Sequence, residues 1–328
     1  MNNPMIDKIL EVIKQKNNFL IAAHINPEGD SIGSQMAFQY LLEKLNKNSV
    51  IVNNDPVPNN LKFLRGSENV LNEMPQGFNP EAVIILDCPV KERTGFVSEV
   101  IDKNAFIVNI DHHVSNEHFG DVNWVEDSAS SVGEMMFFLI KKAGIKIEPE
   151  AAEMMYASIV TDTGCFNYEN TSSLTHKTVA ELIECGVSTV KMHNKIFENK
   201  SLDQTKLLGK VLSTLRTECG GKIAYMCLLK EFVKDVSPGS VITDEFINFA
   251  RAVAGVEVAV FFKEKNNHAK QVNVSFRSNN FVNVDLIASY FGGGGHSKAS
   301  GCLIDGDMEK AMKIVLAKVR ETIEHTGE

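Results

Sequence analysis

Four short apolar segments, separated by stretches with helical periodicity, dominate the first half of the chain and constrain its fold. They lie at residues 19–24, 50–53, 82–87 and 105–110, and a helical pattern covers residues 31–45. Continuous apolar strands are typical of a parallel sheet that is covered on both faces, because neither face meets water. The pattern therefore predicts a doubly wound, mainly parallel α/β domain. Further helices of this domain are expected at residues 131–143, 149–160 and 170–185.

The second half of the chain has a different pattern, in which strands and helices are mixed. The expected strands are residues 222–229, 256–262, 271–277 and 301–304, and the expected helices are residues 284–290 and 308–324. The polar stretch 263–270 joins two of these strands and predicts a hairpin. We therefore expect a second, smaller domain of mixed α/β type.

The length of 328 residues also indicates two domains, since a domain typically holds about 100–200 residues. We expect residues 1–195 to form the first domain and residues 209–328 the second, with residues 196–208 as a linker. No apolar run reaches about 18 residues, so no membrane span is expected. Residues 1–16 lack the pattern of a signal peptide. These features predict a cytoplasmic protein.

Charge and cysteine content disfavour several classes of function. The formal net charge is −9, and binding to long duplex DNA depends on basic residues that neutralise phosphates. A short oligonucleotide or a small phosphorylated ligand can still be held by a few local cations. The six cysteines are scattered and form no CxxC pair. Neither a cysteine-type zinc site nor a disulfide framework is therefore expected.

Acidic residues and histidines gather where the strands of the first half are expected to end. Ligands of open α/β sheets bind outside the carboxyl ends of the strands, so we expect these side chains to share one crevice. The residues are His24, Glu28 and Asp30 after the first strand, Asp87 at the end of the third, Asp111, His112 and His113 after the fourth, and Asp162 after a helix expected to end near residue 160.

So many carboxylates in one crevice would repel one another unless bound cations neutralised them. Mixed imidazole and carboxylate ligands suit manganese, iron or zinc, and the eight residues are too many for one ion and about right for two. A pair of metal ions is a known arrangement for in-line attack at phosphorus. Each residue taken singly has a simpler explanation, such as a helix cap for Asp30, a turn for Asp87 or a core histidine for His24.

A run of four glycines at residues 292–295 is the main motif of the second half. Glycine lets the backbone approach a ligand closely and adopt positive φ, so we expect this run to bind a phosphate rather than to serve packing. A helix stop is the alternative explanation. Arg277, at the end of an expected strand, is a candidate bidentate phosphate ligand, with a solvated strand-end arginine as its alternative.

The Asp111-His112-His113 triplet, taken with the acids and histidine around it, resembles the motifs of the DHH phosphoesterase superfamily. Residues 292–301, with the sequence GGGGHSKASG, resemble the GGGH-containing signature of the DHHA1 domain, which usually follows a DHH domain. Both signatures occur in the expected order and together span nearly the whole chain. Size and domain layout are similar to the branch of nanoRNases and pAp phosphatases.

The resemblance implies an activity and a role for each residue. Enzymes of that branch degrade RNA of a few nucleotides to mononucleotides, and many remove the 3′-phosphate of 3′-phosphoadenosine 5′-phosphate (pAp). Two divalent cations are implied, manganese first, with magnesium, cobalt or iron as alternatives. His24 and Glu28 resemble ligands of a first metal, Asp30, His112 and Asp162 resemble ligands of a second, and Asp87 resembles a carboxylate that bridges the two. His113 resembles a histidine near the scissile phosphate, and Asp111 resembles a residue that orients the histidines. The segment that holds the phosphate end of the substrate in the family resembles Gly293, Gly294, Gly295 and His296.

Other functions stay open at this point. The chain could act mainly on the dinucleotide pApA in cyclic-di-AMP turnover, or as a RecJ-like single-strand exonuclease, although its short length disfavours the latter. A catalytically silent nucleotide sensor is the alternative outside the enzymes, and the complete ligand set argues against it. The resemblance makes short RNA or a nucleotide the expected partner and a homodimer one expected assembly, with no long duplex DNA or membrane.

Overall fold

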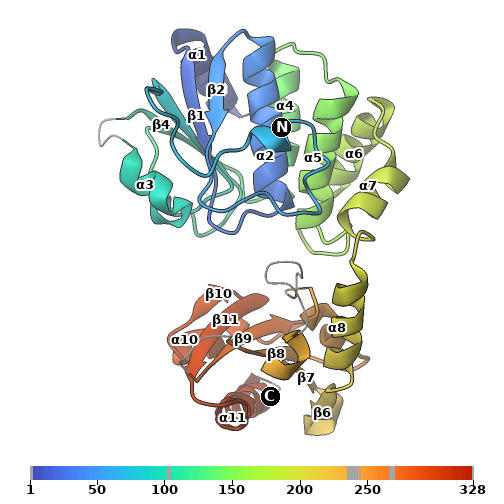
Figure 1. The fold of residues 1–328 in the computed structure, drawn as a ribbon. Helices are drawn as coiled ribbons and strands as arrows, with labels where there is room; N and C mark the ends of the chain where they lie inside the picture. Colours follow the sequence, from blue (N-terminus) through green and yellow to red (C-terminus); the bar gives the residue numbers. More distant parts are fainter. Residues whose placement is uncertain (1–2, 102–104, 235–242, 244, 266–269, 327–328) are drawn as a thin grey trace. The chain divides into compact units, whose positions relative to one another are not determined.

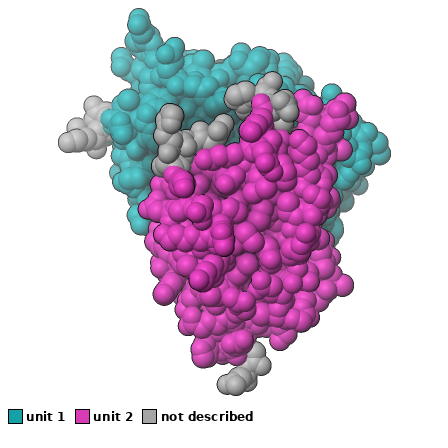
Figure 2. Space-filling view, turned by 60° about the horizontal axis from the view of Figure 1, so that its bottom comes forward, with its two compact units in different colours: residues 1–199 teal, residues 200–328 magenta. Residues whose placement is uncertain are grey.

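The chain folds into two compact units, shown in different colours in Figure 2. The computed structural model describes residues 3–101, 105–234, 243, 245–265 and 270–326. The units are Met1–Asn199 and Lys200–Glu328, so their boundary lies within the stretch 196–208. Among the described residues, no helix combines the length and the apolar character that a membrane crossing requires.

The first unit is built on a five-stranded sheet in which every neighbouring pair of strands is parallel. The strand order is β2-β1-β3-β4-β5, which confirms the predicted parallel α/β domain. Strands β1, β2 and β4 of this sheet are labelled in Figure 1. The order reverses between β1 and β3, and such a switch point is where open α/β sheets bind ligands. The strands are β1 (Asn18–Ala22), β2 (Asn48–Ile51), β3 (Ala82–Leu86), β4 (Ile107–Asp111) and β5 (Val122–Val125).

Both faces of this sheet are buried, as the absence of alternation in the sequence predicts. In β1, Phe19 and Ile21 belong to a core formed with α1, α2, α4 and α5, whereas Leu20 and Ala22 belong to a smaller core on the other face, together with Val97 of α3. The helices are α1 (Pro4–Gln15), α2 (Gly29–Lys44), α3 (Phe96–Val100), α4 (Val132–Lys142), α5 (Pro149–Asp162), α6 (Ser173–Glu184) and α7 (Thr189–Ile196), with 3-10 helices at Ser67–Asn69 and Lys91–Thr94.

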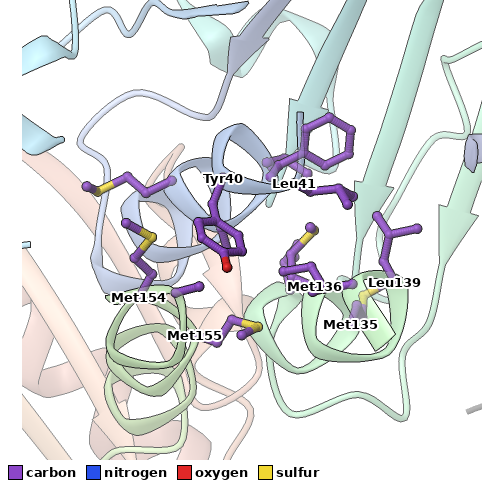
Figure 3. Close-up of a cluster of buried hydrophobic side chains, with 14 of the residues drawn as sticks. Tyr40, Leu41, Met135, Met136, Leu139, Met154 and Met155 are labelled. Atoms are coloured by element: carbon purple, nitrogen blue, oxygen red, sulfur yellow. The ribbon is translucent and has the colours of Figure 1, made fainter. Parts of the chain in front are cut away.

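Helices α2, α4 and α5 pack closely on one another. Figure 3 shows their contact, where Met136 of α4 lies between Met155 of α5 and Leu41 of α2, and Leu139 of α4 lies on the side away from Met155. All four side chains are fully buried. Unbranched methionine side chains fit irregular gaps, which suits a region where three helices meet. This packing holds the three helices against one another.

The second unit contains a six-stranded mixed sheet with the order β10-β11-β9-β8-β7-β6. Among the described strands of this sheet, β7 and β8 alone pair in parallel, and β8 and β9 are antiparallel as the predicted hairpin requires. Helices α10 and α11 cover one face, and α8 and α9 cover part of the other. The elements are α8 (Leu202–Leu212), β6 (Arg216–Glu218), β7 (Ile223–Leu228), α9 (Ile247–Arg251), β8 (Val258–Glu264), β9 (Gln271–Ser278), α10 (Val284–Tyr290), β10 (Gly294–His296), β11 (Ala299–Asp305) and α11 (Met308–Thr326), with 3-10 helices at Cys219–Gly221 and Lys230–Val233.

A buried carboxylate, Glu257, fixes the turn between β9 and α10. Its Oε1 atom accepts the backbone N–H groups of Asn280, Phe281 and Val282 at 2.8–3.2 Å, and Oε2 accepts the side-chain amide of Asn280 at 2.9 Å. Burial alone would raise the pKa of Glu257, but these donors outweigh it and hold the pKa below its usual value. The ionised carboxylate therefore stabilises the fold at neutral pH.

We expect Glu257→Gln to destabilise the protein by about 1–3 kcal/mol at pH 7, because an amide replaces an acceptor-only group among several donors. Since the pKa is lowered in the folded state, the difference from wild type should be full above about pH 5 and shrink as the pH falls. Hydrogen exchange should show faster exchange at residues 280–282. Glu324→Gln, at an exposed position of α11, is the control, and unchanged protection of residues 280–282 in Glu257→Gln would contradict the role of Glu257.

Candidate metal centre

The acids and histidines of the first unit come together at the carboxyl ends of β1, β3 and β4. His24 follows β1, Asp87 follows β3 directly, and Asp111 is the last residue of β4. Asp87 adopts a left-handed backbone conformation with φ of 51°, and its N–H donates to the carbonyl of Ile110 at 3.0 Å. Aspartate tolerates this region better than most residues. The strand thus ends abruptly and leaves the Asp87 carboxylate at the switch point.

A first group of ligand atoms comprises Asp87, His112 and His113. One atom from each lies within 4.8 Å of the others. Asp87 Oδ1 is 3.8 Å from His112 Nε2 and 3.7 Å from His113 Nδ1. The other oxygen, Oδ2, is 3.4 Å from His24 Nε2 and accepts the Ser31 hydroxyl at 2.7 Å. The two oxygens of Asp87 therefore face different imidazoles, as a bridging carboxylate would.

A second group comprises Asp30, His112 and Asp162, again within 4.8 Å of one another. His112 Nε2 lies 3.6 Å from Asp30 Oδ2 and 3.6 Å from Asp162 Oδ2. Because His112 Nδ1 lies 3.2 Å from the Ala129 carbonyl oxygen, which can only accept, Nδ1 carries the proton. Nε2 is then the nitrogen directed at the carboxylates, which is the arrangement that metal-binding histidines use.

The carboxylate of Asp30 caps the start of α4. Its Oδ2 accepts the N–H of Val132 at 2.9 Å, and its Oδ1 accepts the N–H of Gly133 at 3.1 Å and the Ser158 hydroxyl at 2.6 Å. A Cβ atom at Gly133 would overlap the Ser158 side chain, and one at Gly33 would overlap the Met154 carbonyl. Glycine at these two positions therefore lets α2, α4 and α5 approach closely enough for these hydrogen bonds.

The carboxyl groups of this centre have strongly displaced pKa values. Burial, together with the charge of Asp87, raises the pKa of Asp30 to about 6, although His112 and the Ser158 hydroxyl oppose the change. Burial and the nearby carboxylates of Asp30 and Asp87 raise the pKa of Asp162 to about 8 against the attraction of His112. These two carboxyl groups therefore resist ionisation unless a positive charge joins them.

The pKa values of Asp87 and of the histidines are shifted in the directions expected for ion pairs. Burial would raise the pKa of Asp87, but its contacts with His24, His113 and His112 hold the pKa below its usual value. Burial would lower the pKa of His112, but the surrounding carboxylates raise it to about 9. The pKa values of His24 and His113 are also raised against the effect of burial. The centre thus attracts positive charge strongly.

Asp111 and Asn116 form a support beneath His113. Asp111 is fully buried, and its Oδ1 accepts the Nδ1–H of His113 at 2.7 Å. Its Oδ2 accepts the Asn116 amide at 2.6 Å, and that amide also donates to Asn109 Oδ1 at 2.8 Å. The sequence does not predict this role of Asn116, because an asparagine in a loop carries no signal of a distant contact. Ser31, Ser158 and Asn170, which also contact the acids, were missed for the same reason.

The structure corrects the expected position of one ligand, and the role of a second stays untested. Helix α5 extends to Asp162, so Asp162 is the last residue of the helix rather than a residue beyond an end near 160. Glu28 is the N-cap residue of α2, is exposed, and belongs to neither group of ligand atoms. Its role as a ligand stays a prediction.

The glycine run of the second unit is partly a matter of packing, and the expectation that it serves binding alone is wrong. Gly292 ends α10 with φ of 75°, and Gly293 N–H donates to the Ala288 carbonyl at 2.9 Å, as in a helix stop. A Cβ at Gly293 would overlap the carbonyl of Gly301, and one at Gly295 would lie 2.6 Å from the carbonyl of Ala299. The expected loop is instead strand β10, which pairs with β11.

The other residues expected to bind substrate also lie in the second unit. Gly294 is exposed in β10, where a Cβ would meet only Asp285 Oδ1 at 3.7 Å. Arg277, in β9, is half-buried, donates to the Phe276 carbonyl at 3.0 Å and pairs across the sheet with Ala299. The side chain of His296 lies outside the described part of the structure. Their contact with substrate stays a prediction.

The donor set of the first unit fits divalent metal ions. Each group contains at least one carboxylate oxygen and one imidazole nitrogen, and His112 belongs to both. The second group has two carboxylates with raised pKa values, and a bound cation would offset their burial and the repulsion from neighbouring carboxylates. Mixed oxygen and nitrogen ligands are typical of manganese, iron and zinc sites.

Comparison with known proteins places these motifs in a family. Residues 18–159 match the DHH family, N-terminal domain, and residues 229–325 match the DHHA1 domain. A Thermus thermophilus protein named bifunctional oligoribonuclease and PAP phosphatase NrnA is 31% identical, over 97% of this chain and 94% of its own length. A Bacillus subtilis protein of the same name is 31% identical, over 92% of this chain and 93% of its own length.

A solved structure agrees with these matches. An exopolyphosphatase-related protein from Bacteroides fragilis is 26% identical and superposes with a TM-score of 0.92, over 99% of this chain and 98% of its own. The match covers both units, and the two family domains occur in the same order as the two units. The chain therefore belongs to the DHH family of metal-dependent phosphoesterases, in which it is a hydrolase with a DHH domain followed by a DHHA1 domain.

Proposed function

We propose that the chain hydrolyses short oligoribonucleotides to mononucleotides and removes the 3′-phosphate of pAp, using two divalent cations. The observation that carries this proposal is the cluster around Asp87, whose oxygens face His24 on one side and His112 on the other, with Asp30 and Asp162 beside His112. The substrates follow from the names of relatives that align with nearly the whole chain. Manganese is the proposed metal because it accepts both imidazole and carboxylate ligands, with magnesium, cobalt or iron as alternatives.

The proposed ligands divide between two metal positions. His24 and Glu28 would hold one ion, and Asp30, His112 and Asp162 the other. Asp87 would bridge the two, since its oxygens face imidazoles on both sides. Bound cations of this kind neutralise phosphoryl charge and lower the pKa of water, which supplies the nucleophile at neutral pH.

Residues outside the ligand set would complete the reaction. Asp111 accepts the Nδ1–H of His113, so proton exchange with the departing oxygen of the substrate falls to His113 Nε2. Buried and hydrogen-bonded on both oxygens, Asp111 holds that imidazole in one orientation. In the second unit, Arg277 and the segment Gly293–His296 would bind a substrate phosphate.

The substrate class is tested by comparing kcat/KM with manganese across pAp, pApA, RNA of two to about ten nucleotides and a long single strand. We expect the highest values for pAp and for RNA of two to about five nucleotides. Fast cleavage of pApA with slow cleavage of pAp would move the chain to cyclic-dinucleotide turnover. No turnover of any substrate would contradict the proposed function.

Asp87→Asn should lower kcat/KM by more than about 100-fold, because loss of a residue that merely supports a ligand already costs about 10–100-fold. The amide keeps the shape of the side chain but not its charge, so circular dichroism should stay unchanged. Asp121→Asn is a matched control, since Asp121 accepts the N–H of Ile107 at the amino end of β4. Activity of Asp87→Asn within a few-fold of the control would exclude a bridging role.

Metal binding at pH 7 should release protons. His112 and Asp162 lie 3.6 Å apart and both have raised pKa values, so the pair holds a proton at pH 7 that it must lose to bind a metal ion. Apparent manganese affinity should therefore rise between about pH 6 and pH 9. Calorimetric titrations in buffers of different ionisation heat measure the protons released. Asp162→Asn should release fewer protons when it binds manganese. A manganese affinity that does not change with pH would contradict this electrostatic account.

A further inference from the structure

Asn170, in the segment between α5 and α6, contacts the end of α5 and the start of α4 at once. Its Nδ2 group lies 3.1 Å from Asp162 Oδ2, 3.2 Å from the Asp162 carbonyl oxygen and 2.9 Å from the Ser130 carbonyl oxygen. All three partners are acceptors. One side-chain amide therefore joins the Asp162 carboxylate to the backbone that precedes α4.

Hydrogen bonds also hold in place the backbone segment that Asn170 contacts. Ser130 N–H donates to Glu134 Oε2 at 2.8 Å, and Glu134 N–H donates to the hydroxyl of Ser131, the N-cap residue of α4, at 3.1 Å. This reciprocal arrangement resembles a capping box and fixes the entry of the chain into the helix. Ser130, Ser131 and Glu134 are fully buried.

The same segment already holds two members of one ligand group. The carbonyl of Ala129 accepts the Nδ1–H of His112, and the N–H of Val132 donates to Asp30. Residues 129–132 thus orient Asp30 and His112 directly. Asn170 extends this support to Asp162, the third member of the group.

Asp162 needs such support more than the other two ligands. It is the last residue of α5, where the helix dipole disfavours a negative charge. The carboxylates of Asp30 and Asp87 lie nearby and also repel it. Its side chain is 30% exposed, whereas that of Asp30 is 3% exposed, so packing restrains it less. Only His112 attracts it within the group, at 3.6 Å.

We propose that Asn170 is a positioning residue that keeps Asp162 within the group of Asp30 and His112, and so sets the affinity of that one metal position. The inference rests on the proposed two-metal centre. The position nearer His24 does not depend on Asn170, because the hydrogen bonds of Asn170 reach only Asp162 and Ser130 among the described residues. Loss of the amide should therefore affect the two ions unequally.

The test is a manganese titration of the full chain, followed by calorimetry and by electron paramagnetic resonance. Wild type should bind two ions and show the signal of a coupled pair. Asn170→Ala should keep one ion at near wild-type affinity and bind the other about 10–100-fold more weakly. Its spectrum at low manganese should be that of an isolated ion. Asn170→Ser, which disturbs packing less but cannot span three acceptors, should behave in the same way.

Asn60→Ala is the matched control, since Asn60 is also half-buried and its side-chain amide donates to a backbone carbonyl, that of Ile196. It should bind both ions as wild type does. Two ions bound to Asn170→Ala or Asn170→Ser with wild-type affinities would overturn the proposal, as would an equal loss of both ions. Because the titration measures binding rather than turnover, it decides the role of Asn170 even if the proposed substrates are not hydrolysed.

Discussion

The buried carboxylate of Asp30 is the interaction on which the architecture of the metal centre depends. It sits on α2, caps α4 through two backbone N–H groups and accepts a hydroxyl from α5. A carboxylate at a helix N-terminus is stabilised by the helix dipole, which offsets part of the cost of burying it. Three helices are thus aligned by one side chain, and that side chain also faces His112. The same hydrogen bonds therefore align the helices and position a candidate metal ligand.

The charges of the centre are arranged against stability rather than for it. Asp30 and Asp162 have raised pKa values and Asp87 a lowered one, so the three carboxyl groups differ although they lie in one crevice. Strong pKa shifts in opposite directions are typical of functional sites. The hydrophobic cores on both faces of the sheet supply the stability that this arrangement removes. The centre is therefore preorganised for cations by a scaffold whose stability comes mainly from these cores.

The sequence predicted the parallel sheet and the shared crevice because both follow from local patterns. Continuous apolar strands predict the layers, and strand ends predict where His24, Asp87 and His112 meet. The supporting contacts of Asn116 and Asn170 were not predictable, because they join residues whose proximity only the packing of helices decides. The glycine run was misjudged for the same reason, since the neighbour of Gly293 is a carbonyl eight residues later in the chain, at Gly301.

Strand β10 lies at the edge of its sheet and consists of two glycines and a histidine. Close approach of β11 excludes a side chain at Gly295, and Gly294 has none to offer. A surface of this kind presents peptide groups that are the same whatever ligand lies against them. If the phosphate end of a nucleotide is held there, these two glycines offer no side chain that could distinguish adenine from guanine or a pyrimidine. The edge of this sheet would then suit an enzyme that must accept short RNA fragments of any sequence.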